Sequence, residues 1–375
     1  MPDQSSLNAD DPLLLPPSEL GKLTSGECWW RDHQQWLAEL GYMLRPRYRP
    51  GWEPSWKKNP GRMPIACEDW YPAIHAALLD AVRVSDNSLV MLKQVTKTRN
   101  PQEISITQFL SSDALRHDPG NHTVPILDVF PVPDDEDITI LVMPLLRFCD
   151  DPRWRTVGEV IAFLSQIFEG MAFMHELNVA HRDCQHPNIM YDPRPIYPAM
   201  FHPRQRTLAL NWKDPAKHST RTDHPVKYYY IDFGLSRKYN PEDGPPREHP
   251  IRGGDKTVPE FQNWKGELLD PFPTDVYYLG NMIRMTILEQ GYRGLEFLAP
   301  LAEDMIHTDP AKRPTIQDVV RRFDELVKSL GSWKLRSRLV PLDEDASDRF
   351  DRTVVHIFRT ARYVLTRKPA IPLPR

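Results

Sequence analysis

The chain has 375 residues, of which 40% are hydrophobic, and 47 Lys and Arg against 51 Asp and Glu give a formal net charge of −4. This length allows one large domain or two modest ones with a sizeable core, and the balanced charge excludes the strong global attraction to nucleic acid or acidic membranes that basic proteins have. The four cysteines, at positions 28, 67, 149 and 184, have no CxxC spacing and indicate reduced thiols rather than a disulfide framework.

The N-terminal region predicts a tail followed by a helix. Residues 1–24 are polar and proline-bearing, which is typical of a flexible tail. Residues 27–40 place Trp29, Trp30, Trp36 and Leu37 at helical spacing, and Gly41 follows where a helix often ends. We therefore expect residues 25–73 to form a helix and an extended arm.

The arm from residue 45 to residue 58 interleaves arginines and lysines with Tyr48, Trp52 and Trp56. Such a pattern can bind single-stranded nucleic acid by charge and stacking. The alternative is an arm whose aromatic side chains pack on the domain while its arginines stay exposed. The net charge favours the second interpretation, and no nucleic-acid partner is expected.

Two strands are predicted over residues 76–84 and 89–95, on either side of the polar turn 85–88. The second strand carries Lys93 among apolar residues, and an ammonium group there needs an anionic partner. A helix containing residues 103–110 and a short buried strand over 138–143 are expected to follow.

The second half of the chain is mainly helical by pattern. Residues 157–177 have a strong apolar stripe, and a last core helix starts at Thr315, with Asp318 as its capping partner. Between them, the proline-rich segment 192–226 cannot be regular helix and is predicted to be an inserted loop that ends at a strand over 227–231. The tail 331–375 is basic; residues 354–358 are expected to pack, and the proline-ended C-terminus to fray.

Three polar side chains carry the strongest chemical signal. Asp183 and Asn188 lie five residues apart in the turn-rich stretch HRDCQHPN (181–188), and Asp232 directly follows the strand-like run YYYI. Converging oxygen-bearing side chains of this kind suit a magnesium ion on a triphosphate and the orientation of an attacking hydroxyl.

These stretches resemble the catalytic loop and the DFG motif of eukaryotic protein kinases. The polar, proline-rich stretch after Gly234 resembles the family's activation segment, and its end at Val258, Pro259 and Glu260 resembles the APE motif. Asp275 resembles the central-helix aspartate of the family, and Arg313 the late arginine that pairs with Glu260. The resemblance implies an α+β, bilobal protein kinase-like fold. It divides the chain into a small β-rich N-lobe over 74–146, a mainly helical C-lobe over 147–330, and a C-terminal extension over 331–375.

The resemblance also implies roles for site residues. Asp183 would accept or orient the hydroxyl proton, Asn188 and Asp232 would bind Mg²⁺, and Lys93, held by Glu103, would bind the α- and β-phosphates of ATP. Leu146 lies at the end of the hinge that binds adenine through backbone groups. Arg182 would lie beneath the activation segment and pair with a phosphate if Ser236, Tyr239 or Thr257 were modified.

The sequence does not decide which residue of the helix after Lys93 faces that lysine. With Glu103 as the partner of Lys93, the position four residues later, usually apolar in the family, is Thr107. With Ser105 in its place, Phe109 would fit the core but the ion pair would be lost.

Three departures from the family pattern bear on activity. No GxGxxG precedes Lys93, Gln185 stands where serine/threonine kinases usually carry a lysine against the γ-phosphate, and Gly253 stands where they have a threonine. The last two departures indicate that one network was removed as a unit. ATP binding and transition-state stabilisation should both be weaker as a result.

The sequence therefore favours an ATP-dependent serine/threonine protein kinase acting on a protein substrate, with Mg²⁺ as cofactor. The alternative is a pseudokinase that acts by binding proteins. A small-molecule kinase is less favoured, because such kinases usually lack the arginine at 182, the Pro-Glu segment end and the late arginine. The sequence shows no leader and no apolar run near the 20 residues that cross a bilayer, so no membrane partner and an intracellular, cytoplasmic or nuclear location are expected. It leaves the oligomeric state undecided.

Overall fold

The computed structural model describes residues 21–59, 61–251, 253–262 and 264–374. Most of the predicted N-terminal tail thus lies outside the described residues. The chain forms two compact units. The first contains the described residues up to Thr96 together with 126–145 and 199–217, and the second contains 97–125, 146–198 and the chain from His218 onward.

The first unit is built on a five-stranded antiparallel sheet with the order β1-β2-β3-β5-β4. Its strands are β1 (Tyr42–Leu44), β2 (Leu78–Arg83), β3 (Ser88–Thr96), β4 (Asp128–Val132) and β5 (Asp135–Pro144), and its helices are α1 (Ser25–Asp32), α2 (Gln34–Glu39) and α3 (Ser55–Lys58). The two strands predicted on either side of residues 85–88 are confirmed as β2 and β3.

The N-terminal segment supplies much of this unit's core. Trp30, Tyr42 and Tyr48 are buried in one apolar cluster with side chains of β2 and β3, among them Leu79 and Val90. The single helix predicted over 27–40 is wrong in one respect. It is interrupted at His33, which ends α1 and precedes α2.

The arm that follows packs its aromatic side chains, as one of the two interpretations predicted, but its first two arginines are not exposed. Arg47 donates to Glu27 at 2.7 Å and is 3% exposed, while Arg45 lies 3.0 Å from Asp80. Tyr48 donates to the same Glu27 at 3.0 Å. Buried arginines are normally paired in this way, because an unpaired charge in the interior is very costly.

The inserted segment has no helix or strand among the described residues of 192–226, as its prolines predict. Its middle part belongs to the first unit, where it packs on the arm. His202 Nε2 lies 3.1 Å from Glu68, and Trp212 donates to the Ala66 carbonyl at 3.0 Å and packs its ring against Tyr71.

The second unit is mainly helical. Its helices are α4 (Glu103–Leu110), α5 (Val157–Glu176), α6 (Pro259–Gln262), α7 (Phe272–Met282), α8 (Ala299–Met305), α9 (Ile316–Ser329), α10 (Ser332–Arg336) and α11 (Ala346–Leu365), and α7 continues into a π-helical stretch, Ile283–Glu289. Its strands are short: β6 (Arg147–Phe148), β7 (Val179–Ala180), β8 (Ile189–Tyr191), β9 (Tyr228–Tyr230), β10 (Arg237–Lys238), β11 (Tyr292–Arg293) and β12 (Val340–Pro341). With the sheet-based first unit, this gives the α+β, kinase-like fold class that the sequence predicts.

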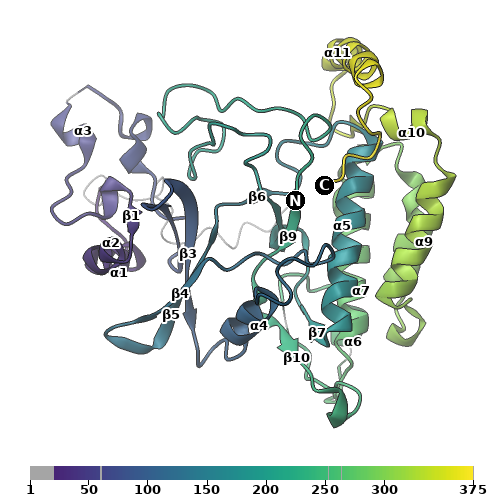
Figure 1. The fold of residues 1–375 in the computed structure, drawn as a ribbon, viewed down its shortest axis with the longest axis horizontal. Coiled ribbons are helices and arrows are strands. Elements are labelled where there is room, and N and C mark those ends of the chain that lie inside the picture. Colours follow the sequence, from purple (N-terminus) through teal and green to yellow (C-terminus); the bar gives the residue numbers. More distant parts are fainter. Residues whose placement is uncertain (1–20, 60, 252, 263, 375) are drawn as a thin grey trace. The chain divides into compact units, whose positions relative to one another are not determined.

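Helix α5 is the centre of the second unit (Figure 1). It runs beside α9, where the Phe168 and Phe323 rings meet edge to face, and it contacts β9 on another side. By length and composition it could cross a membrane, but 83% of its most apolar window is buried inside the protein, which fits a core helix.

The C-terminal part departs from its prediction. Helix α11 turns polar groups toward the body of the unit, with Tyr363 bonded to Thr220 and Arg362 to Asp223. Within the stretch expected to pack, Ile357 and Phe358 are 60% and 73% exposed. The final segment does not fray up to residue 374: it folds back so that Gly158 of α5 lies directly against the Ala370 carbonyl.

Candidate active site

The stretch 181–188, called the catalytic loop below for its resemblance to that of protein kinases, is positioned by α7. Asp275, which is fully buried, accepts hydrogen bonds from the backbone N–H groups of His181 at 2.8 Å and Arg182 at 2.7 Å. Arg182 has a φ of 67°, a conformation that is costly for a residue with a side chain and persists only when its surroundings enforce it. Asp275 supplies that constraint, and His175 Nε2, 3.1 Å away, orients its carboxylate.

Asp183 is held by three donors. Its Oδ1 accepts from the Gln185 side chain and from the Gly254 backbone, both at 3.0 Å, and its Oδ2 accepts from the Asn188 side chain at 2.9 Å. Burial raises the pKa of Asp183 above its ordinary value, and the charge of Asp232 acts in the same direction, while the Gly254 and Gln185 donors oppose them. A raised pKa brings a carboxylate closer to the pH at which a general base is most efficient.

Two glycines make this arrangement possible. A Cβ at Gly253 would lie 2.5 Å from the Asp183 Oδ1, and a Cβ at Gly254 would lie 1.8 Å from the Gln185 Nε2. At position 253 the added atom would displace the Asp183 carboxylate itself, whereas at position 254 it would displace the end of the Gln185 side chain. The sequence indicated a network removed as a unit; the structure instead has another network there, made by Gln185 and the Gly254 amide.

Asn188 and Asp232 present oxygen atoms near Asp183. The Asn188 Nδ2 donates to both the carbonyl oxygen and the Oδ2 of Asp183 at 2.9 Å, and its Oδ1 accepts no hydrogen bond from any residue that the structure describes. Asp232 follows β9 with a φ of 63°, and its Oδ1 accepts from Gly234 at 3.3 Å. Amide and carboxylate oxygens are the ligands that Mg²⁺ prefers, so these residues fit that ion.

His181 has a supporting position. Its ring packs against Tyr230 and Phe233, and its Nε2 lies 3.1 Å from the Ile231 carbonyl. Burial lowers the pKa of His181 below its ordinary value, so the ring is neutral near neutral pH. It links the catalytic loop to the residues around Asp232.

Helix α4 lies beside the 3₁₀ turn Phe233–Leu235 of the second unit. Asn100, just before α4, donates to the Gly234 carbonyl at 2.9 Å, and the carboxylate of Glu103 lies 3.3 Å from the position that a Cβ would take on Gly234. Glu103 is 2% exposed whereas Ser105 is exposed, which favours the register with Glu103 turned inward.

The remaining predicted site residues are Lys93 in the first unit and Leu146 in the second. Lys93 is half-buried on β3 of the first unit, opposite Leu141 in the strand register. Leu146 is the first residue of the second unit after β5 and is 8% exposed.

Arg182 already has partners in the activation segment. Its guanidinium donates to the carbonyl of His249 at 3.1 Å and lies 3.7 Å from the Glu248 carboxylate. Ser236, one of the residues expected to carry a phosphate for Arg182, is fully buried and donates to the His181 carbonyl at 3.0 Å. That expectation is wrong for Ser236, because no modifying enzyme can reach its hydroxyl while the unit is folded.

The predicted ion pair at the end of the activation segment is confirmed. Arg313 donates to the two carboxylate oxygens of Glu260 at 2.8 and 2.6 Å, and the two side chains are 0% and 9% exposed. A bidentate, charge-assisted pair of this kind fixes geometry as well as adding energy. It anchors α6 to the chain before α9.

Sequence reasoning missed three contributors: Asn100, Glu248 and Gly254. Of the three, only Gly254 could have been found from the sequence, because two consecutive glycines stand a few residues before the Pro-Glu end of the activation segment. The roles of Asn100 and Glu248 depend on contacts between distant residues.

Comparison with known proteins finds distant protein-kinase relatives. The serine/threonine-protein kinase pim-2 of Danio rerio is 26% identical in an alignment of 132 residues that covers 30% of this chain and 42% of the relative. A protein of Acanthamoeba polyphaga mimivirus, named as a candidate serine/threonine-protein kinase, is 23% identical in an alignment of 217 residues that covers 51% of this chain and 64% of the relative. The matches thus span less than two thirds of either relative. No protein-family model matches the sequence.

Proposed function

We propose that this protein is an ATP-dependent kinase that transfers the γ-phosphate of ATP to serine or threonine hydroxyls of a protein substrate. The observation that carries the proposal is the hydrogen-bonded pair of Asp183 and Asn188, which fixes a carboxylate beside an amide oxygen that accepts no hydrogen bond from a described residue. Phosphoryl transfer asks the protein mainly for such positioning and for charge stabilisation. The distant kinase relatives support the same reaction class.

Each residue has a stated task in this proposal. Asp183 would orient the substrate hydroxyl and accept its proton, and Asn188 and Asp232 would hold Mg²⁺ through oxygen atoms. Lys93, fixed by Glu103, would hold the α- and β-phosphates. Bound Mg·ATP supplies the transferable phosphoryl group and neutralises charge that develops on its oxygens. Gln185 keeps Asp183 in place but offers no positive charge, so the transfer should be slow compared with enzymes that have a lysine there.

The second candidate is a pseudokinase that acts by binding proteins. It is favoured by the first unit, in which the chain between β1 and β2 runs through the arm rather than through a short glycine-rich turn. Backbone N–H groups that closely approach the phosphates would then be missing. The free thiols support an intracellular location in either case.

Thermal unfolding with increasing Mg·ATP tests nucleotide binding first. A ligand that binds only the folded state must raise stability by mass action, so no shift at millimolar Mg·ATP rejects the enzyme proposal. If ATP binds, phosphate transfer to a generic substrate is compared between the native protein and Asp183→Asn. Transfer that Asp183→Asn abolishes supports the kinase, whereas binding without transfer in either protein supports the pseudokinase.

A further inference from the structure

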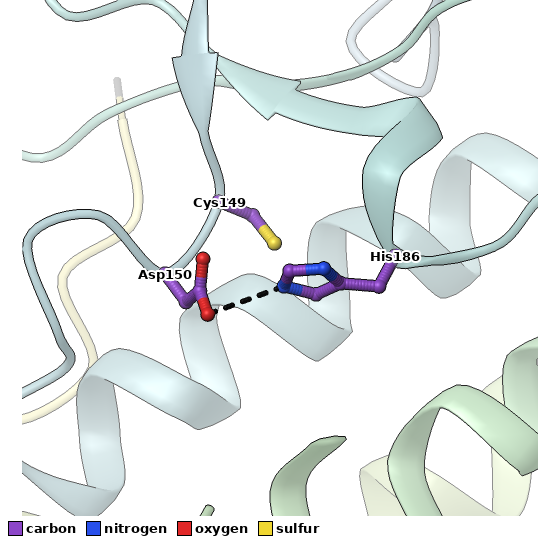
Figure 2. Close-up of side chains that lie close together, drawn as sticks. All are labelled: Cys149, Asp150 and His186. Atoms are coloured by element: carbon purple, nitrogen blue, oxygen red, sulfur yellow. Dashed lines mark ion pairs between the residues drawn. The ribbon is translucent and has the colours of Figure 1, made fainter. Parts of the chain in front are cut away.

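Three potential metal-binding side chains, none of them assigned to Mg²⁺, meet at the end of a strand pair. Cys149 and Asp150 directly follow β6, and His186 precedes β8, which pairs with β6 through Arg147 and Tyr191. Figure 2 shows the sulfur of Cys149 and the carboxylate of Asp150 turned toward the His186 ring. The strand pairing thus brings together residues that lie far apart in the sequence.

The separations fit a tetrahedral metal site. The Asp150 Oδ2 and the His186 Nε2 are 3.3 Å apart, and the three candidate ligand atoms lie within 4.8 Å of one another. Nitrogen and oxygen ligands about 2.0–2.1 Å from zinc are roughly 3.4 Å apart at the tetrahedral angle. The pair already has this spacing, and the sulfur needs to approach by about 1 Å.

An ordinary histidine–aspartate pair explains these contacts less completely. The His186 Nε2 is buried and, among the described residues, makes no well-aligned hydrogen bond, although the Asp150 Oδ2 is 3.3 Å away. The thiols of Cys28, Cys67 and Cys184 donate to the carbonyls of Leu23, Met63 and Asp275, whereas the Cys149 thiol has no acceptor among the residues that the structure describes. Within the described part of the chain, a thiol without an acceptor and an imidazole nitrogen paired with a carboxylate but without a well-aligned hydrogen bond therefore lie close together.

From these contacts, we propose that Cys149, Asp150 and His186 bind a zinc ion that fastens the chain after β6 to the catalytic loop. Thiolate and imidazole together select zinc over magnesium, which prefers oxygen ligands only. Two anionic ligands and a neutral imidazole balance the charge of Zn²⁺, and the thiol proton is released to solvent on binding. Asp150 and His186 are 41% and 24% exposed, so a water molecule can take the fourth position.

The surroundings are compatible with a bound thiolate. Burial and the charge of Asp150 raise the pKa of the free Cys149 thiol well above its ordinary value, whereas the charge of Arg221 and the backbone N–H groups of Cys149 and Asp150 favour the ionised sulfur. The Arg221 guanidinium donates to the Cys149 carbonyl at 2.9 Å and so keeps this segment in position. A coordinated metal supplies the remaining stabilisation of the thiolate.

Cobalt substitution tests the proposal without any measurement of kinase activity. The full chain is purified under reducing conditions, stripped with a chelator and titrated with Co²⁺, which gives a near-ultraviolet charge-transfer band only when a thiolate binds it. We expect one equivalent of Co²⁺ with this band, displacement of Co²⁺ by Zn²⁺, and a higher unfolding temperature with Zn²⁺. Cys149→Ser should lose the band, and the matched control Cys67→Ser should keep it.

Variants at two half-exposed positions provide a second test in case Cys149→Ser fails to fold. His186→Gln and Asp150→Asn should each weaken Co²⁺ binding at least tenfold while the metal-free unfolding temperature stays within a few degrees of the native protein. The proposal is overturned if the native protein binds less than a tenth of an equivalent, or if the charge-transfer band survives in Cys149→Ser. Because ATP is absent, failure here leaves the proposed kinase function unaffected.

Discussion

The contact between the activation segment and Asp183 can be tested with Gly254→Ala. The new methyl group would lie 1.8 Å from the Gln185 Nε2. That atom is the far end of a flexible side chain, so Gln185 will turn away while the Gly254 backbone stays. Asp183 then keeps its bonds to the backbone of residue 254 and to Asn188 but loses the donor that Gln185 supplied at 3.0 Å.

The size of the effect follows from the charge on the acceptor. A hydrogen bond to an ionised group contributes about 1.5–3 kcal/mol, and one pKa unit corresponds to about 1.4 kcal/mol. The lost donor stabilised the ionised form, so the pKa of Asp183 should rise by roughly one to two units. The pKa is already raised by burial, and the acidic limb of the pH–rate profile should therefore move further toward high pH.

The assay is the pH dependence of kcat/KM for phosphate transfer to a generic substrate. It compares the native protein, Gly254→Ala, Gln185→Ala and the double variant. If Gly254→Ala acts by displacing the Gln185 side chain, the double variant should have the same pH profile as Gln185→Ala, because the two changes remove the same interaction. Gly331→Ala is the control, since nothing lies within 4 Å of a Cβ there. An unshifted limb in Gly254→Ala, or additive effects in the double variant, would refute the reasoning.

Two further predictions concern stability. Arg313→Leu leaves Glu260 buried without its partner and should lower the free energy of unfolding by about 3–5 kcal/mol in urea titrations. The control Arg153→Leu, at an exposed ion pair, should lower it by less than about 1 kcal/mol. Equal losses in the two variants would contradict this account. Gly158→Ala places a methyl group 1.8 Å from the Ala370 carbonyl and should displace the C-terminal segment at a cost of about 1–3 kcal/mol. Carboxypeptidase should then digest the chain past residue 370 faster than in the native protein, and equal digestion rates would show that the segment is not held by this contact.

The elements and pairs that sequence reasoning found depend on local patterns or on fixed motif spacing. Strands β2 and β3 follow from alternation around a polar turn, and the expected helix over 157–177 agrees with α5 almost to the residue. The Glu260–Arg313 pair came from the order of motifs along the chain and is buried as expected. The positions assigned to substrate, ATP and Mg²⁺ remain predictions that binding experiments must test.

The predictions that proved wrong concern segments whose burial depends on contacts with residues far away in the sequence. Arg45 and Arg47 lie in a basic, aromatic stretch that looks solvent-exposed, yet their carboxylate partners come from α1, from β2 and from the arm itself. Residues 354–358 have the composition of a packed segment. Helix α11 instead turns its polar face toward the rest of the unit, where it bonds to Thr220 and Asp223. In both cases tertiary charge pairing decided which face of the segment is buried.

The placement of residues 199–217 in the first unit has a consequence for synthesis of the chain. The sheet and its N-terminal helices are translated by Pro144, but His202 and Trp212, which cover the arm at Glu68 and Ala66, emerge only after α5 and the catalytic loop. Domains usually fold as units in the order in which they leave the ribosome. Here the first unit stays incomplete until part of the second has been made, so the arm's surface at Glu68 and Ala66 stays uncovered until residues 199–217 have been translated.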